Sequence, residues 1–292
     1  MFDIKDHICA AGAAVCEDAV GWGRDYLFAL DGASGLTGAR LMEEGSDAAW
    51  FAAGVRDGLC RRLDGGDRRS TAEILAEVLA ELRQAYEARA AELGIPVPPD
   101  SPSAGLALFR ELGEQVEFFG LGDCVGAAEK TDGGLFSSCD TALPALDRQV
   151  VMRMAAIRRE TGISVLNARK QCGGLLLEHR MLRNRPGGYW ILDPSGAGLS
   201  HARIRRWRRD ELRTVSVFSD GFAQLAEPFR LYDGYEALHM AATNIPLQAL
   251  VEQLFSAQEA DPEANRFPRL KFRDDTCALW ARVLPCGKEE FP

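Results

Sequence analysis

Apolar residues recur at helical spacing in three segments of the chain. The first is residues 45–63, where one face of the predicted helix carries Ala48, Ala49, Ala52, Val55 and Leu59. The second begins at Ser70-Thr71-Ala72-Glu73, which has the form of a capping box, and we expect its helix to end near Leu93. The third covers residues 146–160 and ends near Gly162. We expect the first two helices to pack against a sheet.

Shorter apolar runs predict the strands of that sheet. Residues 104–110 and 115–121, joined by a turn at 111–114, are typical of a hairpin. Further strands are predicted at residues 26–29, 188–192, 214–218 and 277–284. The proline-rich segment 95–102 is predicted to be a loop, because proline lacks an amide donor and biases its predecessor towards an extended conformation. This order of elements favours an α+β sandwich over a strictly alternating βαβ fold.

Length and composition are those of a globular protein. The chain has 292 residues, of which 47% are hydrophobic and 26% charged, and we predict a single domain over residues 1–292. The net charge of −9 argues against a general nucleic-acid binder. The first residues lack the features of a signal peptide, and no stretch approaches the roughly 18 apolar residues of a membrane span. We therefore expect a cytoplasmic protein that binds neither nucleic acid nor membrane.

The eight cysteines indicate free thiols more than disulfides or zinc ligands. None of them forms a C-x-x-C pair, and most lie in apolar runs. A phosphatase with a cysteine nucleophile needs an arginine six positions after the cysteine to bind the phosphate. No cysteine in this chain has one, so that class is excluded.

Acidic residues stand beside the predicted strands at five places. These are Glu17-Asp18, Asp31-Gly32, Gly122-Asp123, Asp220-Gly221 and Asp274-Asp275. An aspartate at a strand end, next to a glycine whose carbonyl is unshielded, is typical of oxygen-rich sites for small divalent cations. A single Asp-Gly is more often only a turn, but five acidic steps along one chain favour a shared metal site. Without a cation, carboxylates that converged there would repel one another.

In their order and spacing these steps, together with the small residues of Pro102-Ser103-Ala104 before a strand, resemble the metal-dependent protein phosphatases, the type 2C serine/threonine phosphatase family. The resemblance extends from about residue 8 to residue 284 and is that of a divergent, bacterial-like member. It implies a central antiparallel β-sandwich flanked by helices on both faces, in four α-β-β-α layers. It also implies two Mg²⁺ or Mn²⁺ ions at one end of the sandwich.

The resemblance assigns a role to each acidic step. Asp31 would bridge the two ions, Glu17 and the carbonyl of Gly32 would bind one of them, and Asp220 with Asp274 would bind the other. The activity implied is hydrolysis of phosphoserine and phosphothreonine in proteins by direct attack of a metal-bridging water. Two such ions about 4 Å apart lower the pKa of that water and offset the charge of the phosphoryl oxygens. No protein nucleophile is required.

Further residues at the site follow from the same resemblance. Asp18 would orient bound water, and Asp123 would be a ligand of a third ion. The family pairs that aspartate with an acid four residues beyond Asp220, where this chain has Gln224. A third ion would therefore be loosely held or absent.

The chain departs from the family where the substrate phosphate binds. Many members have an arginine at the position of Ala13. Arg24 and the basic stretch 201–209 are substitutes by residue type, although a charge run more often forms a solvated face. We also found none of the usual substrate-flap motifs between Asp123 and Asp220.

Ala33-Ser34-Gly35 replaces a segment that supplies histidine or methionine in well-studied members, so a proton donor to the leaving group must come from elsewhere. A structural or surface role is favoured for each histidine, at positions 7, 179, 201 and 239.

Three functions remain open from the sequence. The first is a metal-dependent phosphatase whose partner is a phosphorylated protein. The second is a pseudophosphatase that keeps the fold as a binding or regulatory module. It is considered because Ala13 stands where many members have the phosphate-binding arginine. The third is a metal-dependent phosphoester hydrolase that acts on small molecules.

Overall fold

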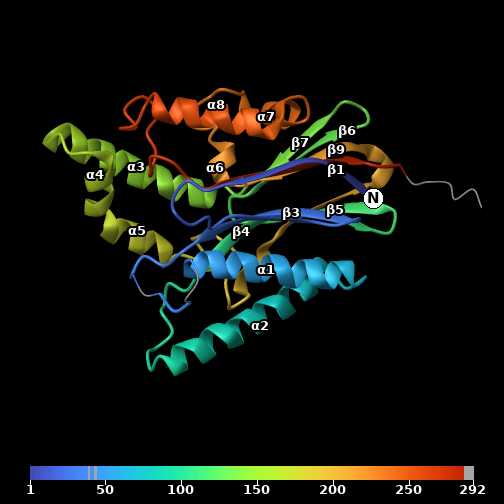
Figure 1. Cartoon of the computed structure of the whole chain (residues 1–292), viewed down its shortest axis with the longest axis horizontal. Helices are drawn as coiled ribbons and strands as arrows, with labels where there is room; N and C mark the ends of the chain where they lie inside the picture. Colours follow the sequence, from blue (N-terminus) through green and yellow to red (C-terminus); the bar gives the residue numbers. More distant parts are fainter. Residues whose placement is uncertain (39, 43–44, 286–292) are drawn as a thin grey trace, which may run out of the picture.

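Two antiparallel β-sheets stack face to face, with helices outside both (Figure 1). The computed structural model describes residues 1–38, 40–42 and 45–285. The first sheet contains, in spatial order, β1 (Phe2–Ala10), β10 (Thr276–Val283), β9 (Leu212–Phe218), β6 (Val125–Lys130) and β7 (Leu135–Ser138). The second contains, in spatial order, β2 (Ala19–Trp22), β3 (Tyr26–Ala33), β4 (Ser103–Leu112), β5 (Gln115–Leu121) and β8 (Arg203–Arg208).

The helices complete the four layers that the sequence predicted. On the second sheet lie α1 (Asp47–Asp64) and α2 (Thr71–Glu92), with α1 packed on β3 and β4. On the first sheet lie α6 (Asp220–Ala223), α7 (Gly234–Ala242) and α8 (Leu247–Glu259). Three further helices gather at one end of the sandwich, at the left of Figure 1: α3 (Ala142–Thr161), α4 (Val165–Gln171) and α5 (Gly173–Arg180). Two 3₁₀ turns, η1 (Ala197–His201) and η2 (Arg209–Glu211), flank β8.

The strand β3 is apolar without alternation because both of its faces are buried. Successive side chains of a strand point to opposite faces. Accordingly Phe28 and Leu30 pack under α1 and α2, whereas Leu27 and Ala29 face the other sheet. Burying a side chain the size of leucine or phenylalanine contributes about 1.5–3 kcal/mol. The same burial fixes the register of β3, and with it the position of Asp31 at the strand's end.

The predicted helices are present, with the expected local signals. Ser70 and Glu73 form the capping box of α2, and the hydroxyl of Ser46 caps α1. The helix α3 begins at Ala142, earlier than predicted, and ends at Thr161; the next residue, Gly162, has a φ of 70°, the left-handed conformation that glycine favours. The hairpin of β4 and β5 and the strands β9 and β10 are confirmed as well.

The strand predicted at residues 188–192 is wrong. This segment makes only isolated bridges, of Leu192 with Ala104 and of Tyr189 with Arg183. The amide and carbonyl of Leu192 both bond to Ala104, but Pro194 follows and has no amide to extend the ladder.

The helices α3, α4 and α5 have a small apolar cluster of their own, separate from the layers around the sheets. It contains Val150, Met154, Ile157, Val165, Ala168 and Cys172, together with Ala264. The segment between β7 and β8 therefore forms a helical cap at one end of the sandwich. Within the described residues, no helix combines the length and the apolar character needed to cross a membrane.

The cysteines of the described residues are free thiols, and Cys124, Cys172 and Cys277 are buried as predicted. Cys9 is exposed instead, and its sulfur lies 3.5 Å from that of Cys16. Cys286 lies outside the described residues.

Candidate metal centre

The second sheet brings three aspartates to one end of the sandwich. Asp31 lies opposite Gly105 in the pairing of β3 with β4. Asp18 directly precedes β2, whose first residue pairs with Leu30. Asp123 follows β5, and its Oδ1 lies 3.2 Å from where a Cβ on residue 105 would stand. Because Gly105 has no side chain, the carboxyl groups of Asp31 and Asp123 interact across it.

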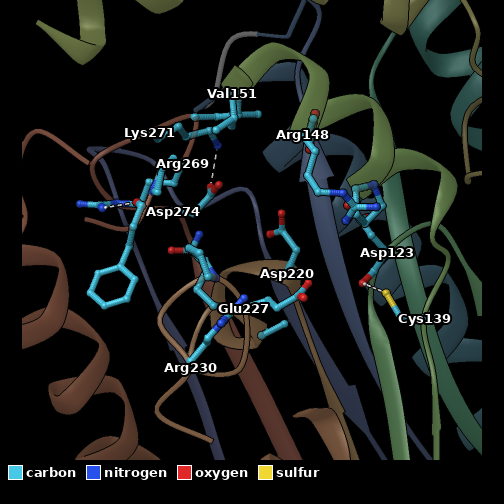
Figure 2. Close-up of a pocket in the computed structure, with 18 of the residues that line it drawn as sticks. Asp123, Cys139, Arg148, Val151, Asp220, Glu227, Arg230, Arg269, Lys271 and Asp274 are labelled. Atoms are coloured by element: carbon cyan, nitrogen blue, oxygen red, sulfur yellow. Dashed lines mark hydrogen bonds and ion pairs between the residues drawn. The ribbon is translucent and has the colours of Figure 1, made fainter. Parts of the chain in front are cut away.

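The first sheet adds two more aspartates at the same end. Phe218, the last residue of β9, pairs with Ala278 near the start of β10, so Asp220 and Asp274 lie close together. The amide of Asp220 donates to Asp31 Oδ2 at 3.4 Å, and the two carboxyl groups are themselves within hydrogen-bonding reach. Figure 2 shows Asp220 between Asp274 and Asp123. The structure thus brings together the aspartates of all five acidic steps.

These aspartates destabilise one another's ionised form. Burial raises the pKa of Asp31 well above its ordinary value, and repulsion from Asp220 raises it further. Burial followed by the same neighbour raises the pKa of Asp123. The pKa of Asp220 is raised by burial and by Asp274. Burial also raises the pKa of Asp18, whose Oδ2 is enclosed without a hydrogen-bond partner. An unpartnered buried acceptor costs about 1–3 kcal/mol, which a cation would offset.

The donor set suits Mg²⁺ or Mn²⁺, because both prefer carboxylate and carbonyl oxygens. The side chains do not already surround an ion: in the described part of the chain no group of three or more His, Cys, Asp or Glu side chains has the arrangement of a formed metal site. One reason is Asp274, whose Oδ1 accepts from Lys271 Nζ at 2.6 Å. That ion pair raises the pKa of Lys271 although burial acts to lower it. Asp274 must exchange this partner to bind a metal.

Glu17 is the other predicted ligand that has a different partner. Its Oε1 accepts from the hydroxyls of Ser34, at 2.6 Å, and Ser46. The backbone nevertheless joins Glu17 to its predicted neighbour, because the amide of Gly32 donates to the Glu17 carbonyl at 3.2 Å. A Cβ on Gly32 would lie 2.3 Å from that carbonyl oxygen, so only glycine fits.

Asp275 has a structural role beside the centre. Its two carboxylate oxygens accept from the amides of Gly12 and Glu17, each at 2.7 Å. These bonds fix the loop between β1 and β2. Ala13 lies exposed in that loop, directly after Gly12.

A cavity of about 510 Å³ opens beside the carboxylates, lined by Asp123, Asp220 and Asp274. Asp147 of α3 also lines it and was missed by the sequence reasoning. Burial and repulsion from Asp220 raise the pKa of Asp147 to about 7, against the opposing effect of Arg180. No motif marks Asp147. The only sequence signal was its position in the predicted helix 146–160, next to apolar residues.

The arginines suggested as substitutes for the missing phosphate ligand lie elsewhere. Arg24 follows β2 in the turn to β3, at the opposite end of these strands from Asp18 and Asp31, and its Nε lies 2.6 Å from Met1 Sδ. The basic stretch 201–209 is largely a solvated face, as favoured from the sequence, with Arg205, Arg206 and Arg208 exposed. Residues 203–208 form the edge strand β8, with Trp207 buried against Phe136.

The arginines of that stretch have local partners. Arg206 pairs with Glu117 on β5. Arg203 comes nearest to the metal centre, where it donates to the carbonyl of Gly122 at 3.0 Å and pairs with Asp140 at 3.4 Å. Its charge is therefore engaged at the base of β6 and β7.

The histidines and Gln224 have structural or surface positions. His239 is buried between the hydroxyls of Thr214 and Ser216, and burial lowers its pKa to about 4. His201 stacks on Trp190, His7 contacts Trp22, and His179 lies half-buried on α5. Gln224 lines the cavity and accepts from Gln258 at 3.2 Å.

Comparison with known proteins agrees with this architecture. The family model for protein phosphatase 2C matches residues 8–262. The serine/threonine phosphatase Stp1 from Staphylococcus aureus is 11% identical, with a TM-score of 0.54 over 98% of this chain and 96% of that one. The serine/threonine phosphatase PstP/Ppp from Mycobacterium tuberculosis is 14% identical, with a TM-score of 0.55 over 98% of this chain and 100% of that one.

A third structure, the catalytic domain of PstP in complex with 2 manganese ions, is 15% identical, with a TM-score of 0.52 over 98% of this chain and 100% of that one. A search of curated proteins found no match. At these identities the solved structures show a shared fold alone, whereas the family model spans most of the chain. The chain therefore belongs to the protein phosphatase 2C family.

Proposed function

We propose that the chain is a metal-dependent phosphatase that hydrolyses phosphoserine and phosphothreonine in proteins. The observation that carries this proposal is the convergence of Asp18, Asp31, Asp123, Asp220 and Asp274, from both sheets, at one end of the sandwich. Three of them, Asp123, Asp220 and Asp274, also line the cavity. Buried carboxylates with raised pKa values and an unpartnered oxygen are poorly stable as anions by themselves. Divalent cations are their natural complement.

The proposed ligand assignment follows the strand ends. Asp31 would bridge two ions, Asp220 and Asp274 would bind one, and Glu17 with the Gly32 carbonyl would bind the other. Two Mg²⁺ or Mn²⁺ ions, when bound, lower the pKa of a coordinated water and offset charge on the phosphoryl oxygens. Two ligands must first leave their present partners: Glu17 its serine hydroxyls and Asp274 the Lys271 ammonium.

The protein's own groups position and activate the reacting water. One oxygen of Asp18 accepts a hydrogen bond from Ser219, and the other is buried and unpartnered. This fixed carboxylate is suited to accept a hydrogen bond from water and to orient it. Residues of α3, in the helical cap, line one side of the cavity.

The test is turnover of p-nitrophenyl phosphate and of a phosphoserine peptide, with and without Mn²⁺. We expect Mn²⁺-dependent hydrolysis that Asp31→Asn and Asp220→Asn each reduce by at least about 100-fold. Asp57→Asn, an exposed carboxylate of α1 that pairs with Arg56, is the matched control and should retain activity.

Turnover that persists undiminished in chelator, or in Asp31→Asn, would contradict the proposal. Stabilisation by Mn²⁺ without turnover would show a binding module instead of an enzyme. Hydrolysis of the small ester with none of the phosphopeptide would instead indicate a hydrolase of small molecules.

A further inference from the structure

The cavity beside the metal centre has cationic as well as acidic walls. Its carboxylates are opposed by basic residues on α3 and on the segments after α6 and α8: Arg148, Arg230, Arg266, Arg269 and Lys271. A phosphate ester carries negative charge into a site already rich in aspartate. Besides metal ions, it therefore requires a nearby cation whose charge is not already engaged.

Two of these cations have fixed acidic partners. Lys271 binds Asp274 at 2.6 Å, and Arg269 binds Asp261 at 3.1 Å while also donating to backbone carbonyls. Arg266 stacks over the ring of Phe267, 5.0 Å from its centroid. None of these three is free to receive an anion without giving up a contact.

Arg148 differs from them in its surroundings. It is exposed on α3, and among the described residues none forms a hydrogen bond or ion pair with its side chain. It lines both the 510 Å³ cavity and an adjoining cavity of about 600 Å³, so it stands where the two meet. Figure 2 shows Arg148 reaching towards Asp123, across the cavity from Lys271. Arg230 lines both cavities as well, but in Figure 2 it lies beside Glu227, on the side away from Asp123.

The helical cap fixes α3, and so Arg148, over the strand ends. Arg180 of α5 donates to the carbonyl of Ser34 at 3.3 Å and to the hydroxyl of Ser103 at 3.2 Å. Those two residues follow β3 and begin β4, beside Asp31 and Gly32. The apolar cluster of α3, α4 and α5 transmits this anchoring to α3. This support fixes the backbone position of Arg148 before substrate arrives.

We propose that Arg148 binds the phosphoryl oxygens of the substrate, in place of the arginine that Ala13 lacks. This inference rests on the proposed function. The planar guanidinium can donate two parallel hydrogen bonds to a phosphate, and its charge remains at every pH that the fold tolerates. Arg148 reaches the centre from the helical cap, whereas Ala13 lies in the loop between β1 and β2. The cation that binds the phosphate would thus come from α3 instead of from the loop between β1 and β2.

The experiment compares Arg148→Ala with Arg153→Ala in the Mn²⁺-loaded protein. Arg153 is exposed on the same helix but lines a different cavity, so it controls for loss of charge on α3. We expect Arg148→Ala to weaken inorganic phosphate binding, measured by calorimetry, by about 10- to 100-fold. KM for the phosphopeptide should rise by a similar factor, and Mn²⁺ affinity should not change. Introducing Ala13→Arg into Arg148→Ala should restore part of the phosphate affinity.

Three results would overturn the proposal: unchanged phosphate affinity in Arg148→Ala, an equal loss in Arg153→Ala, or loss of Mn²⁺ binding in Arg148→Ala. A loss in Arg180→Ala with none in Arg148→Ala would move the role to Arg180. Phosphate binding is measured without turnover. An inactive wild-type protein would therefore contradict the proposed function while the calorimetry still decides the role of Arg148.

Discussion

Gly32 shows how closely one residue controls the centre. A Cβ there would lie 2.3 Å from the carbonyl oxygen of Glu17, a separation that real contacts do not show. The strand end would have to move, and with it the Asp31 carboxylate and the carbonyl proposed to bind metal. Steric space alone therefore requires glycine at position 32, whether or not its carbonyl binds a metal.

We predict that Gly32→Ala lowers the free energy of unfolding by about 1–3 kcal/mol and weakens Mn²⁺ binding as well. Chemical denaturation and calorimetry measure the two effects. Gly173→Ala is the control, because nothing lies within 4 Å of a Cβ on that glycine at the start of α5. Equal stability of the two variants would contradict the packing argument.

At the scale of elements, two serine caps of the same type have different consequences. Ser70 caps α2, and its hydroxyl bonds to Glu73 of the same helix. Ser46 caps α1 and also donates to the carboxylate of Glu17. The start of α1 is therefore coupled to a proposed metal ligand, and the start of α2 is not.

Replacing each serine by alanine should separate these roles. Both variants should lose about 0.5–2 kcal/mol of stability, as N-cap replacements do. Only Ser46→Ala should change Mn²⁺ affinity, because it removes one of the two hydroxyls that donate to Oε1 of Glu17. Thermal unfolding and Mn²⁺ titration measure the two effects, and an unchanged Mn²⁺ affinity in Ser46→Ala would contradict the coupling of this cap to the metal centre.

The helix α7 is joined to β9 by a buried histidine. His239 lies between two hydroxyls of β9, and its pKa is lowered to about 4 by burial, from an ordinary 6.5. As the pH falls, the unfolded chain takes up this proton before the folded one does. The contribution of neutral His239 is fully present above pH 6.5 and is lost as the pH falls towards 4, by roughly 3 kcal/mol in total.

We expect NMR of the imidazole to show His239 still neutral at pH 5.5 in the folded protein. Titration of His239 near 6.5 would contradict the buried, neutral assignment.

Elements with local signals could be predicted from the sequence. The capping box at Ser70 and the glycine after α3 lie within a few residues of what they determine. The strand β8 could not be predicted, because four of its six residues are arginines and Trp207 is its only buried residue. The position of Asp147 in the cavity wall could not be predicted either, because it depends on where α3 packs and not on neighbouring residues in the sequence.

At the scale of the whole molecule, the centre exists because two sheets end at the same place. Asp31 and Asp123 come from one sheet, and Asp220 and Asp274 from the other, so no single element contains the site. The acidic steps could be recognised in the sequence because each is a short motif at a strand end. The present partners of Glu17 and Asp274 could not, because Ser46 and Lys271 reach them only in the folded chain.

Calorimetric titration of Mn²⁺ into metal-free protein, repeated in buffers of different ionisation enthalpy, tests the metal centre most directly. We predict two ions per chain and a net release of protons, because carboxyl groups with raised pKa values must ionise to bind metal. Asp31→Asn should abolish this binding, and Asp57→Asn should preserve it. Absence of binding in the wild type, or equal binding in Asp31→Asn, would contradict the account.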